Sequence, residues 1–331
     1  MSELQDAIDQ SQEDLKSRDE QVEEEIAATY ADIHRALEVK LENAISDEDE
    51  LSIWRTEQLL QEVEEEFTKY SDTTLKHTIE THSQGAYLEG AESGFRLIQA
   101  QLWDDAVTTG LFTRLPYQHI ESMFGMTRSG PLQRLLASFG PEIAAGMRLE
   151  LVNGIAMGTP PRTIARNMTR HFGIGANRAD NIARTEMLRA YRSSHKRLYQ
   201  ENADILEGWV WHSALDDRSC VLCVAQHGSV HPLDEEMPTH NRCRCSMIPL
   251  TKSWSDLGFT GIQETRYETE LGSAWFSKQP YEKQRKTLGP KAHDAYLAGE
   301  LNITDLVGIK SNRTWGDSVY RKPLSQVLVT P

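Results

Sequence analysis

Cysteine and histidine, the side chains that most often hold zinc, are concentrated in one short segment of this sequence. All four cysteines of the 331-residue chain lie between Cys220 and Cys245, and His240 stands among them. Cys220 and Cys223 form a Cys-x2-Cys pair, and 19 residues separate it from the tighter Cys-x-Cys pair of Cys243 and Cys245. Structural zinc sites commonly use two short-spaced ligand pairs on either side of a loop of about 15 to 20 residues. The second pair is one residue too tight for this pattern, and His240, three residues before Cys243, restores the spacing.

Zinc binds four soft or borderline ligands in a tetrahedron, whereas this segment offers more than four. The candidate ligands are Cys220, Cys223, His240, Cys243 and Cys245. Because at most four side chains can bind one ion in this geometry, one of the five must be a bystander.

Three other interpretations of the cysteines remain open. The thiols could be reduced and pack as small apolar side chains, they could form disulfides, or one pair could be a redox dithiol. Residues 1–25 are acidic and contain no apolar run, so they do not resemble a signal peptide, and a reducing cytosol is the expected compartment. That compartment disfavours disulfides, and the residues around Cys220 lack a thioredoxin-like strand and helix context.

Short strands are predicted on both sides of the cysteine segment, at residues 208–212, 228–231 and 246–250. A Cys-x2-Cys pair at a turn or at the start of a helix allows both thiolates to point at one ion. We therefore expect a small α+β domain in which the sheet and the candidate metal site share one core. A unit of this size needs a staple such as a metal ion.

The N-terminal part of the chain is predicted to be helical, because residues 2–100 contain no proline and apolar residues recur at steps of three and four. Asp47-Glu48-Asp49-Glu50 interrupts the pattern and predicts a loop between two antiparallel helices. Residues up to about Glu25 are polar on nearly all sides, which is typical of a frayed terminus or of a helix ordered only against another protein. The apolar stripes consist of Ile26, Ala27, Tyr30, Ile33, Leu37 and Leu41, and of Ile53, Leu59, Leu60, Val63 and Phe67.

Charge is distributed unevenly along the chain. The formal net charge is −15, and residues 1–70 contain 22 acidic against 6 basic residues, whereas the remaining 261 residues contain 28 acidic and 29 basic residues. An acidic arm on a nearly neutral body predicts different partners for the two parts, and the arm is expected to dock on a partner subunit and to be dispensable for the solubility of the body. No run of eighteen apolar residues occurs, so no membrane association is expected.

The segment 159–200 is locally basic, with nine arginines and lysines against Asp180 and Glu186. One helix is predicted from Thr159-Pro160-Pro161, ending at Gly173-Ile174-Gly175, and a longer helix is predicted from Ala176 to about Asn202. Basic residues four apart lie on one helix face, which suits phosphates, although a basic solvated face paired with acidic helices of the same chain explains them equally well. A helix-turn-helix is a weaker interpretation. The candidate nucleic-acid-binding residues are Arg162, Arg166, Arg170, Arg189, Arg192 and Lys196.

The fold class predicted for the whole chain is mainly α with a small α+β domain: long N-terminal helices, central helices and a short antiparallel sheet around the Cys/His cluster. Four regions are predicted: an acidic helical arm at 1–100, a helical core at 101–158 with a helix starting near Pro141, the domain with the Cys/His cluster at 159–250, and a C-terminal region at 251–331. In the last region we expect helices at 282–287, 290–298 and 302–307, the third capped by Asn302 or Thr304, and an extended tail from 314.

Several short motifs occur in the order found in one phage protein family. They are Ile182-Ala183-Arg184-Thr185-Glu186, Trp211, Asp216-Asp217-Arg218-Ser219-Cys220-Val221-Leu222-Cys223, His227-Gly228 and Pro238-Thr239-His240-Asn241-Arg242-Cys243-Arg244-Cys245. Over roughly residues 150–250 the sequence resembles the head morphogenesis domain of tailed-phage minor head proteins of the Mu F-like type. It departs from the family pattern at Thr239, where a second proline is usual.

The resemblance implies a structural protein of the virion, without catalytic residues and therefore not an enzyme. Similar proteins associate in few copies with the portal vertex of the phage head, which is assembled in the host cytoplasm, and assist head assembly and DNA packaging or delivery. The implied partners are the portal protein, a scaffold or major capsid protein, and double-stranded DNA.

A zinc-dependent nuclease, or a DNA-binding protein without catalysis, is the alternative from another functional class. His240 and Asn241 with the Cys-x2-Cys pair could be taken for a nuclease of the His-Asn-His type. Against this, no second metal-binding histidine follows in helical context, and no pair of acidic residues has the spacing of a two-metal site.

Overall fold

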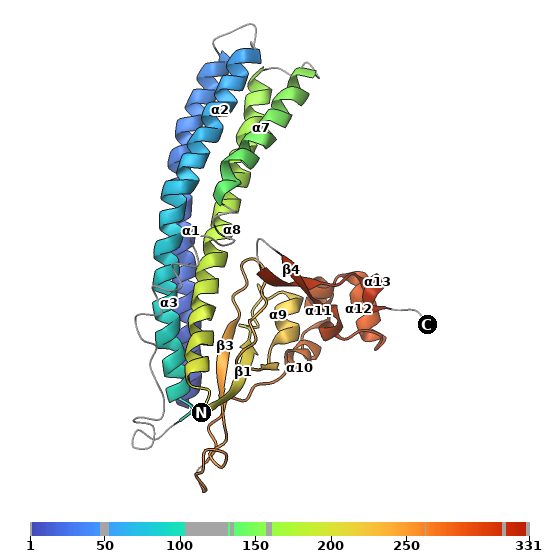
Figure 1. Ribbon diagram of the computed structural model, residues 1–331. Helices are drawn as coiled ribbons and strands as arrows, with labels where there is room; N and C mark the ends of the chain where they lie inside the picture. The colour runs from blue at the N-terminus through green and yellow to red at the C-terminus, as the bar shows by residue number, and fades with distance from the viewer. Residues whose placement is uncertain are drawn as a thin grey trace. The chain divides into compact units, whose positions relative to one another are not determined.

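The computed structural model describes residues 2–46, 53–102, 132, 136–156, 161–261, 263–312 and 316–328. The chain forms two compact units: unit 1 comprises residues 1–16, 86–120 and 188–331, and unit 2 comprises residues 17–85 and 121–187. Both units combine segments that are far apart in the sequence, whereas composition suggested four consecutive regions. The expected fold class, mainly α with a small antiparallel sheet beside a Cys/His cluster, is confirmed (Figure 1). Within the described residues, no helix is both long enough and apolar enough to cross a membrane.

Unit 2 is helical and contains an aromatic core. It contains parts of α1 (Ser2–Ser46), α3 (Lys76–Gln99) and α8 (Pro161–Glu201), together with α2 (Ile53–Tyr70), the π-helical turn η1 (Ser71–Leu75) and α7 (Phe139–Ala156). Helices α1 and α2 run antiparallel, as expected (Figure 1), and the loop predicted between them lies outside the described residues. Phe67 is fully buried, with its ring centroid 5.8 Å from Tyr30, 6.3 Å from Phe139 and 5.5 Å from Phe172.

Helix α8 is one continuous helix, so the break predicted at Gly173-Ile174-Gly175 is wrong, and so is the helix-turn-helix interpretation. The two glycines differ in their surroundings. A Cβ on Gly175 would overlap the hydroxyl of Tyr30 and lie 2.7 Å from Cδ1 of Ile143, whereas a Cβ on Gly173 would meet nothing within 4 Å. Gly175 therefore serves close packing inside unit 2, and a glycine in a helix was mistaken for a helix end.

Helix α1 begins at Ser2, and its first 25 residues have a buried apolar side, which corrects the interpretation that they are polar on nearly all sides. The stripe was missed because two polar residues interrupt it, and each has a specific buried partner. In unit 1, Ser11 forms a triangle of hydroxyl groups with Ser93 and Tyr191, with oxygen separations of 2.8 to 2.9 Å. In unit 2, Asp19 pairs with Arg184. The buried apolar residues of the stripe are Leu4, Ile8, Leu15, Val22, Ile26, Tyr30 and Leu37.

Both compact units therefore use the N-terminal arm in their cores. Leu4 and Ile8 belong to a core of unit 1 with Ile248 and Leu250. Deleting residues 1–66 would expose these apolar surfaces, so the packing argues against the expectation that the arm is dispensable for the solubility of the body.

Unit 1 contains the predicted antiparallel sheet. Its strands are β1 (Leu206–His212), β2 (Val230–His231) and β3 (Ser246–Thr251), in the order β2-β1-β3. Trp209 and Trp211 of β1 belong to one core with the cysteines, whereas Val210 belongs to another core with residues of α1 and α3. Because both faces of the sheet are covered, β1 and β3 are buried along most of their length and do not alternate with polar residues.

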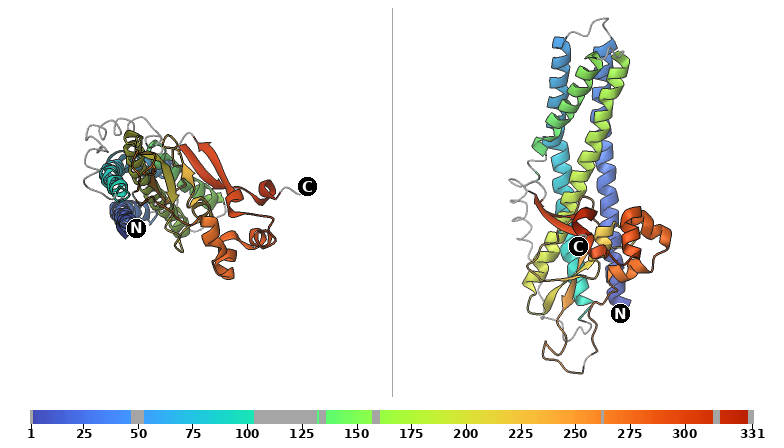
Figure 2. Two further views of the ribbon diagram at one scale, coloured as in Figure 1. Left: turned by 90° about the horizontal axis from the view of Figure 1, so that it is seen from below. Right: turned by 90° about the vertical axis from the view of Figure 1, so that its right-hand side faces the viewer.

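The remaining elements of unit 1 gather around α9 (Val221–Gln226) (Figures 1 and 2). Two helices, α11 (Tyr281–Leu288) and α12 (Pro290–Leu297), match the prediction, and the 3-10 helix η2 (Ile303–Leu306) starts after Asn302, whose N–H donates to the Asp305 carboxylate at 2.8 Å. The tail from 314 is extended over β5 (Gly316–Arg321), as expected, and this strand forms a hairpin with β4 (Val307–Asn312). The tail is then helical rather than extended in α13 (Leu324–Val327), and α10 (Gly272–Ser277) precedes α11.

Candidate metal centre

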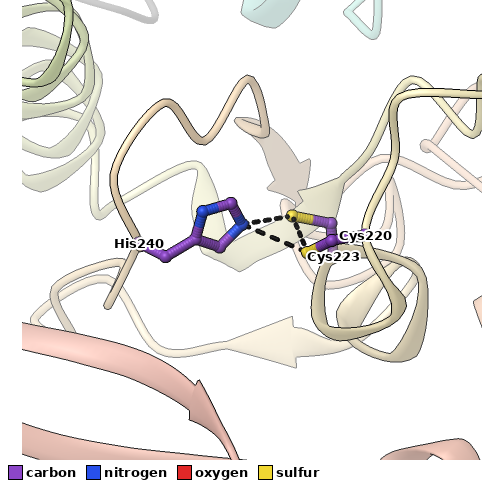
Figure 3. A group of neighbouring side chains, drawn as sticks. All are labelled: Cys220, Cys223 and His240. Atoms are coloured by element: carbon purple, nitrogen blue, oxygen red, sulfur yellow. Dashed lines mark hydrogen bonds between the residues drawn. The ribbon is translucent and has the colours of Figure 1, made fainter. Parts of the chain in front are cut away.

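The Cys-x2-Cys pair lies at the start of α9, as expected. Cys220 is the N-cap residue, in an extended conformation with φ −76° and ψ 160°, and Cys223 lies in the first turn of the helix. This geometry turns both side chains to the same side and brings the two Sγ atoms to 3.5 Å from each other (Figure 3). The short helix therefore presents a pair of thiols, one buried and one partly exposed.

His240 reaches the same pair from the segment between β2 and β3 (Figure 3). Its Nε2 lies 3.2 Å from Sγ of Cys220 and 3.1 Å from Sγ of Cys223. Its Nδ1 lies 2.8 Å from the carbonyl oxygen of Asn241, and because a carbonyl can only accept, Nδ1 carries the proton. When the ring is neutral, the lone pair of Nε2 therefore faces the thiols, and a histidine whose other ring nitrogen donates to a backbone carbonyl is the usual metal-binding arrangement.

Cys243 and Cys245 complete the cluster. Sγ of Cys243 lies 3.8 Å from Sγ of Cys223, and both residues are buried. The ligand atoms form two overlapping groups, each within 4.8 Å: Cys220, Cys223 and His240, and Cys223, Cys243 and Cys245. With a Zn–S bond of about 2.3 Å, the edge between two sulfurs of a zinc tetrahedron is about 3.8 Å, so the observed sulfur separations fit a metal ion. The cluster is therefore close enough to hold a metal ion, with Cys223 common to both groups.

Hydrogen bonds among the thiols lower the pKa of Cys220 and Cys243, whereas hydrogen bonds and burial raise the pKa of Cys223 and Cys245. The hydrogen bond from the Cys223 thiol, together with His240, lowers the pKa of Cys220 to about 4. Burial alone would lower the pKa of His240, but the hydrogen bond to Cys220 and the negative charge of nearby thiolates raise it to about 9. Without a metal, these directions describe a thiolate beside an imidazolium, and a bound cation would replace the proton between them.

An ion pair ties the two halves of the cluster together. Arg244, between the two cysteines of the second pair, donates to both carboxylate oxygens of Asp216, at 2.7 and 2.8 Å. The same carboxylate accepts from the hydroxyl of Ser219 and the backbone N–H of Arg218, both at 3.0 Å. The Arg244 guanidinium holds the pKa of Asp216 well below its usual range. This bidentate pair fixes the turn before Cys220 against the second cysteine pair.

Arg192 of α8 contacts the second cysteine pair from inside the protein. Its Nε donates to the carbonyl oxygen of Cys245 at 3.0 Å, and its Nη2 donates to the carbonyl oxygen of Cys243. The residue is 8% exposed. This burial corrects the prediction that Arg192 faces nucleic acid.

The other predicted nucleic-acid-binding residues lie on α8 and belong to different units. Arg166 and Arg170 are exposed in unit 2, and Arg170 donates to the side chain of Asn167. In unit 1, Arg189 is partly buried and Nζ of Lys196 lies 3.4 Å from the carboxylate of Glu236. The side chain of Arg162 lies outside the described residues. Nucleic-acid binding by these residues stays a prediction.

Comparison with known proteins finds one family model that matches the region containing the cluster. The model of the family described as Phage Mu protein F like protein matches residues 145–248, which include all the cysteines, His240 and Arg192. The chain contains a Mu F-like domain. This confirms the resemblance drawn from the motifs and relates the chain to phage head proteins. The match covers less than a third of the 331 residues. No curated protein and no solved structure matches the chain.

Three residues around the cluster were not predicted to belong to it: Arg192, Asp216 and Arg244. Asp216 and Arg244 appeared only as letters of the family motif, since 28 residues separate them and nothing in their spacing indicates that they pair. A weak signal did exist for Arg244, because successive residues of an extended segment face opposite ways, so Arg244 is expected to point away from the side that Cys243 and Cys245 share. Arg192 gave no such signal.

Proposed function

We propose that this protein is a minor head protein of a tailed phage, bound at the portal vertex, where it assists head assembly and DNA packaging or delivery. The observation that carries the proposal is the Mu F-like match, which spans the entire Cys/His cluster. On this proposal the protein is a component of the virion, and its partners are the portal protein and a scaffold or major capsid protein.

Within this function, we propose that the cluster is a structural zinc site. Thiolate and imidazole ligands at tetrahedral distances suit zinc. The cluster offers five candidate protein ligands in two overlapping groups of three, whereas a catalytic zinc site has three protein ligands and leaves one position to water or substrate. A site that the protein fills with four of the five would support an assembly role over hydrolysis.

The assembly proposal is tested in procapsids produced by co-expressing this chain with the portal and capsid proteins of the same phage. We expect cross-linking and mass spectrometry to join the chain to the portal protein, at few copies per particle. The variant Cys223→Ser is expected to be incorporated less, and Lys291→Gln, a change of an exposed lysine, is the control. A wild-type protein that is absent from procapsids, or that links only to the outer capsid surface, would contradict the proposal.

Contact with DNA is a second candidate, favoured by the exposure of Arg166 and Arg170 one turn apart on α8. If both contact phosphates, the variant with both arginines changed to Gln should lose about two units from the slope of log affinity against log salt concentration. An unchanged slope would mean that the arginines pair within the protein. Incubation of the wild-type protein with DNA and Mg²⁺ or Zn²⁺ tests the nuclease alternative. The DNA should remain intact if the protein is an assembly protein, and cleavage of the DNA would support a nuclease.

A further inference from the structure

Arg192 carries a positive charge into the interior of unit 1, with no acidic partner among the residues that the structure describes. The side chain is 8% exposed, and both of its hydrogen bonds go to uncharged carbonyl groups. Two other arginines with little solvent exposure do have acidic partners. Arg184 pairs with Asp19 and Glu23, and Arg244 pairs with Asp216. A buried charge is costly unless a charge of opposite sign compensates it. Among the described residues, no carboxylate supplies that compensation for Arg192.

The Cys/His cluster next to Arg192 would carry an excess of negative charge when it holds zinc. Only one of its five candidate ligands is a histidine, so any four of them include at least three cysteines. A zinc ion carries two positive charges, and each bound thiolate carries one negative charge. The loaded centre therefore has a net charge of −1 with His240 as a ligand, or −2 with four thiolates. Whichever side chain is the bystander, the centre is an anion in a mostly buried environment.

The geometry brings these two unbalanced charges together. The guanidinium of Arg192 binds the carbonyl groups of Cys243 and Cys245 at once, so it lies against the backbone that carries two of the thiols. Arg244 is the nearest alternative in sequence, but its charge is already matched by the carboxylate of Asp216 at 2.7 Å. Arg242 is exposed on the outside of the same segment. Of these arginines, only Arg192 is both buried and without a carboxylate.

We infer that Arg192 is the counter-ion of an anionic zinc–thiolate centre and positions the Cys243–Cys245 segment around the metal. The inference rests on the proposed zinc site and deepens it, because it specifies the charge of the centre and the residue that balances it. It also gives a physical reason for a charged side chain at this buried position of α8.

The test separates the charge of Arg192 from its hydrogen bonds. R192K keeps the charge but not the forked donor, and R192Q keeps donors but not the charge. R192M is a second neutral variant, of similar length but without donors, for use if R192Q does not fold. R197Q is the matched control, since Arg197 lies on the same helix and pairs with Glu201 at the surface, with 43% of its side chain exposed. The zinc affinity of each full-length protein is measured by competition with a chromophoric chelator, and circular dichroism checks that the helices are retained.

We expect the neutral variants to bind zinc about 10- to 100-fold more weakly than the wild type, the usual range for groups that support metal ligands. R192K should stay closer to the wild type than R192Q or R192M, and R197Q should equal it. Equal loss in R192K and the neutral variants, or no loss in any of them, would overturn the counter-ion inference while leaving zinc in place. A wild-type protein that binds no zinc would instead overturn the metal site itself, so the two failures are distinguishable.

Discussion

The helical core of unit 2 and the cysteine segment of unit 1 are held together in different ways. In unit 2, the aromatic rings of Tyr30, Phe67, Phe139 and Phe172 come from four helices and pack at centroid distances of 5.5 to 6.5 Å. Between β2 and β3 of unit 1, by contrast, residues 232–245 contain no described helix or strand. This segment is tied down by thiols, His240 and two arginines.

The difference lies in how the stabilising free energy is divided. Burial of apolar surface is spread over many side chains, each contributing about 1.5 to 3 kcal/mol, so the loss of one weakens the core without removing it. A zinc ion bound by thiolates concentrates the free energy at one point, on the order of 10 kcal/mol for small zinc units. Substitutions should therefore act gradually in unit 2 and abruptly in the cysteine segment.

Removal of the metal should have the largest effect and is the strongest test of this contrast. Zinc-loaded protein is expected to contain about one zinc per chain, and stripping it should expose residues 208–250 to proteases and hydrogen exchange, since on the order of 10 kcal/mol of local stabilisation is lost. Cys223→Ser should have the same effect, because Cys223 belongs to both ligand groups. Exchange in the helices of unit 2 should change little.

The five ligands should not respond equally. Cys220→Ser is expected to resemble Cys223→Ser, whereas Cys243→Ser, Cys245→Ser and His240→Ala should differ among themselves, because one of these three is the bystander. Substoichiometric zinc in the wild type, together with unchanged protease resistance of Cys223→Ser, would leave the cysteines as packing residues and remove the contrast.

A cavity in the aromatic core should have the next largest effect, and it should spare the metal. Phe67→Ala removes a fully buried ring, which costs about 3 to 5 kcal/mol in free energy of unfolding. We expect a lower denaturant midpoint for the helical signal at unchanged zinc content, measured by circular dichroism and elemental analysis. Loss of zinc from this variant would show that the two regions do not fold independently of one another.

The sequence was sufficient for features that follow from spacing along the chain. Apolar periodicity located α1, α2 and the core of α7, and the alternation between strand and turn residues located the three strands. The Cys-x2-Cys spacing placed Cys220 and Cys223 together because both lie in one helical turn. These properties are local, so they can be read without knowing the fold.

What the sequence could not show depends on pairs of residues far apart in the chain. Ser11 and Asp19 interrupt the apolar stripe of α1 in the sequence. The fold explains them, because Ser11 contacts Tyr191 and Asp19 accepts from Arg184. Arg192 was one of nine basic residues in a basic segment, and only the fold shows that its guanidinium binds the backbone of Cys243 and Cys245. The charge of the segment thus predicted a surface, although two of its basic residues, Arg184 and Arg192, are buried.

A buried neutral histidine contributes to stability in a third way, which depends on pH. His195 of α8 is fully buried in unit 1, and burial lowers its pKa from 6.5 to about 3. As the pH falls below 6.5 the unfolded chain binds a proton that the folded chain refuses, so this contribution to stability is full above pH 6.5 and is lost progressively toward pH 3. Between pH 7 and pH 5 the loss should be about 2 kcal/mol.

Denaturant titrations of the wild type and His195→Asn at several pH values measure this loss. The variant cannot take up a proton at this position, so its stability should vary less by about 2 kcal/mol over the same interval. His77→Asn, a change of an exposed histidine, is the control. Parallel pH profiles for the wild type and His195→Asn would mean that other groups cause the acid sensitivity.

The smallest expected effects come from the two glycines of α8, and they test whether the core of unit 2 is as closely packed as the comparison requires. Gly175→Ala places a Cβ against Tyr30 and Ile143, so it should destabilise the protein by about 1 to 3 kcal/mol, the usual range for overpacking. Gly173→Ala has open space and a helical backbone, so it should stabilise the protein by about 0.5 to 1 kcal/mol. Both variants carry the same chemical change two positions apart, so each serves as the control for the other. Stabilisation by both substitutions would show that Tyr30 and Ile143 yield easily and that the core of unit 2 is loosely packed around Gly175.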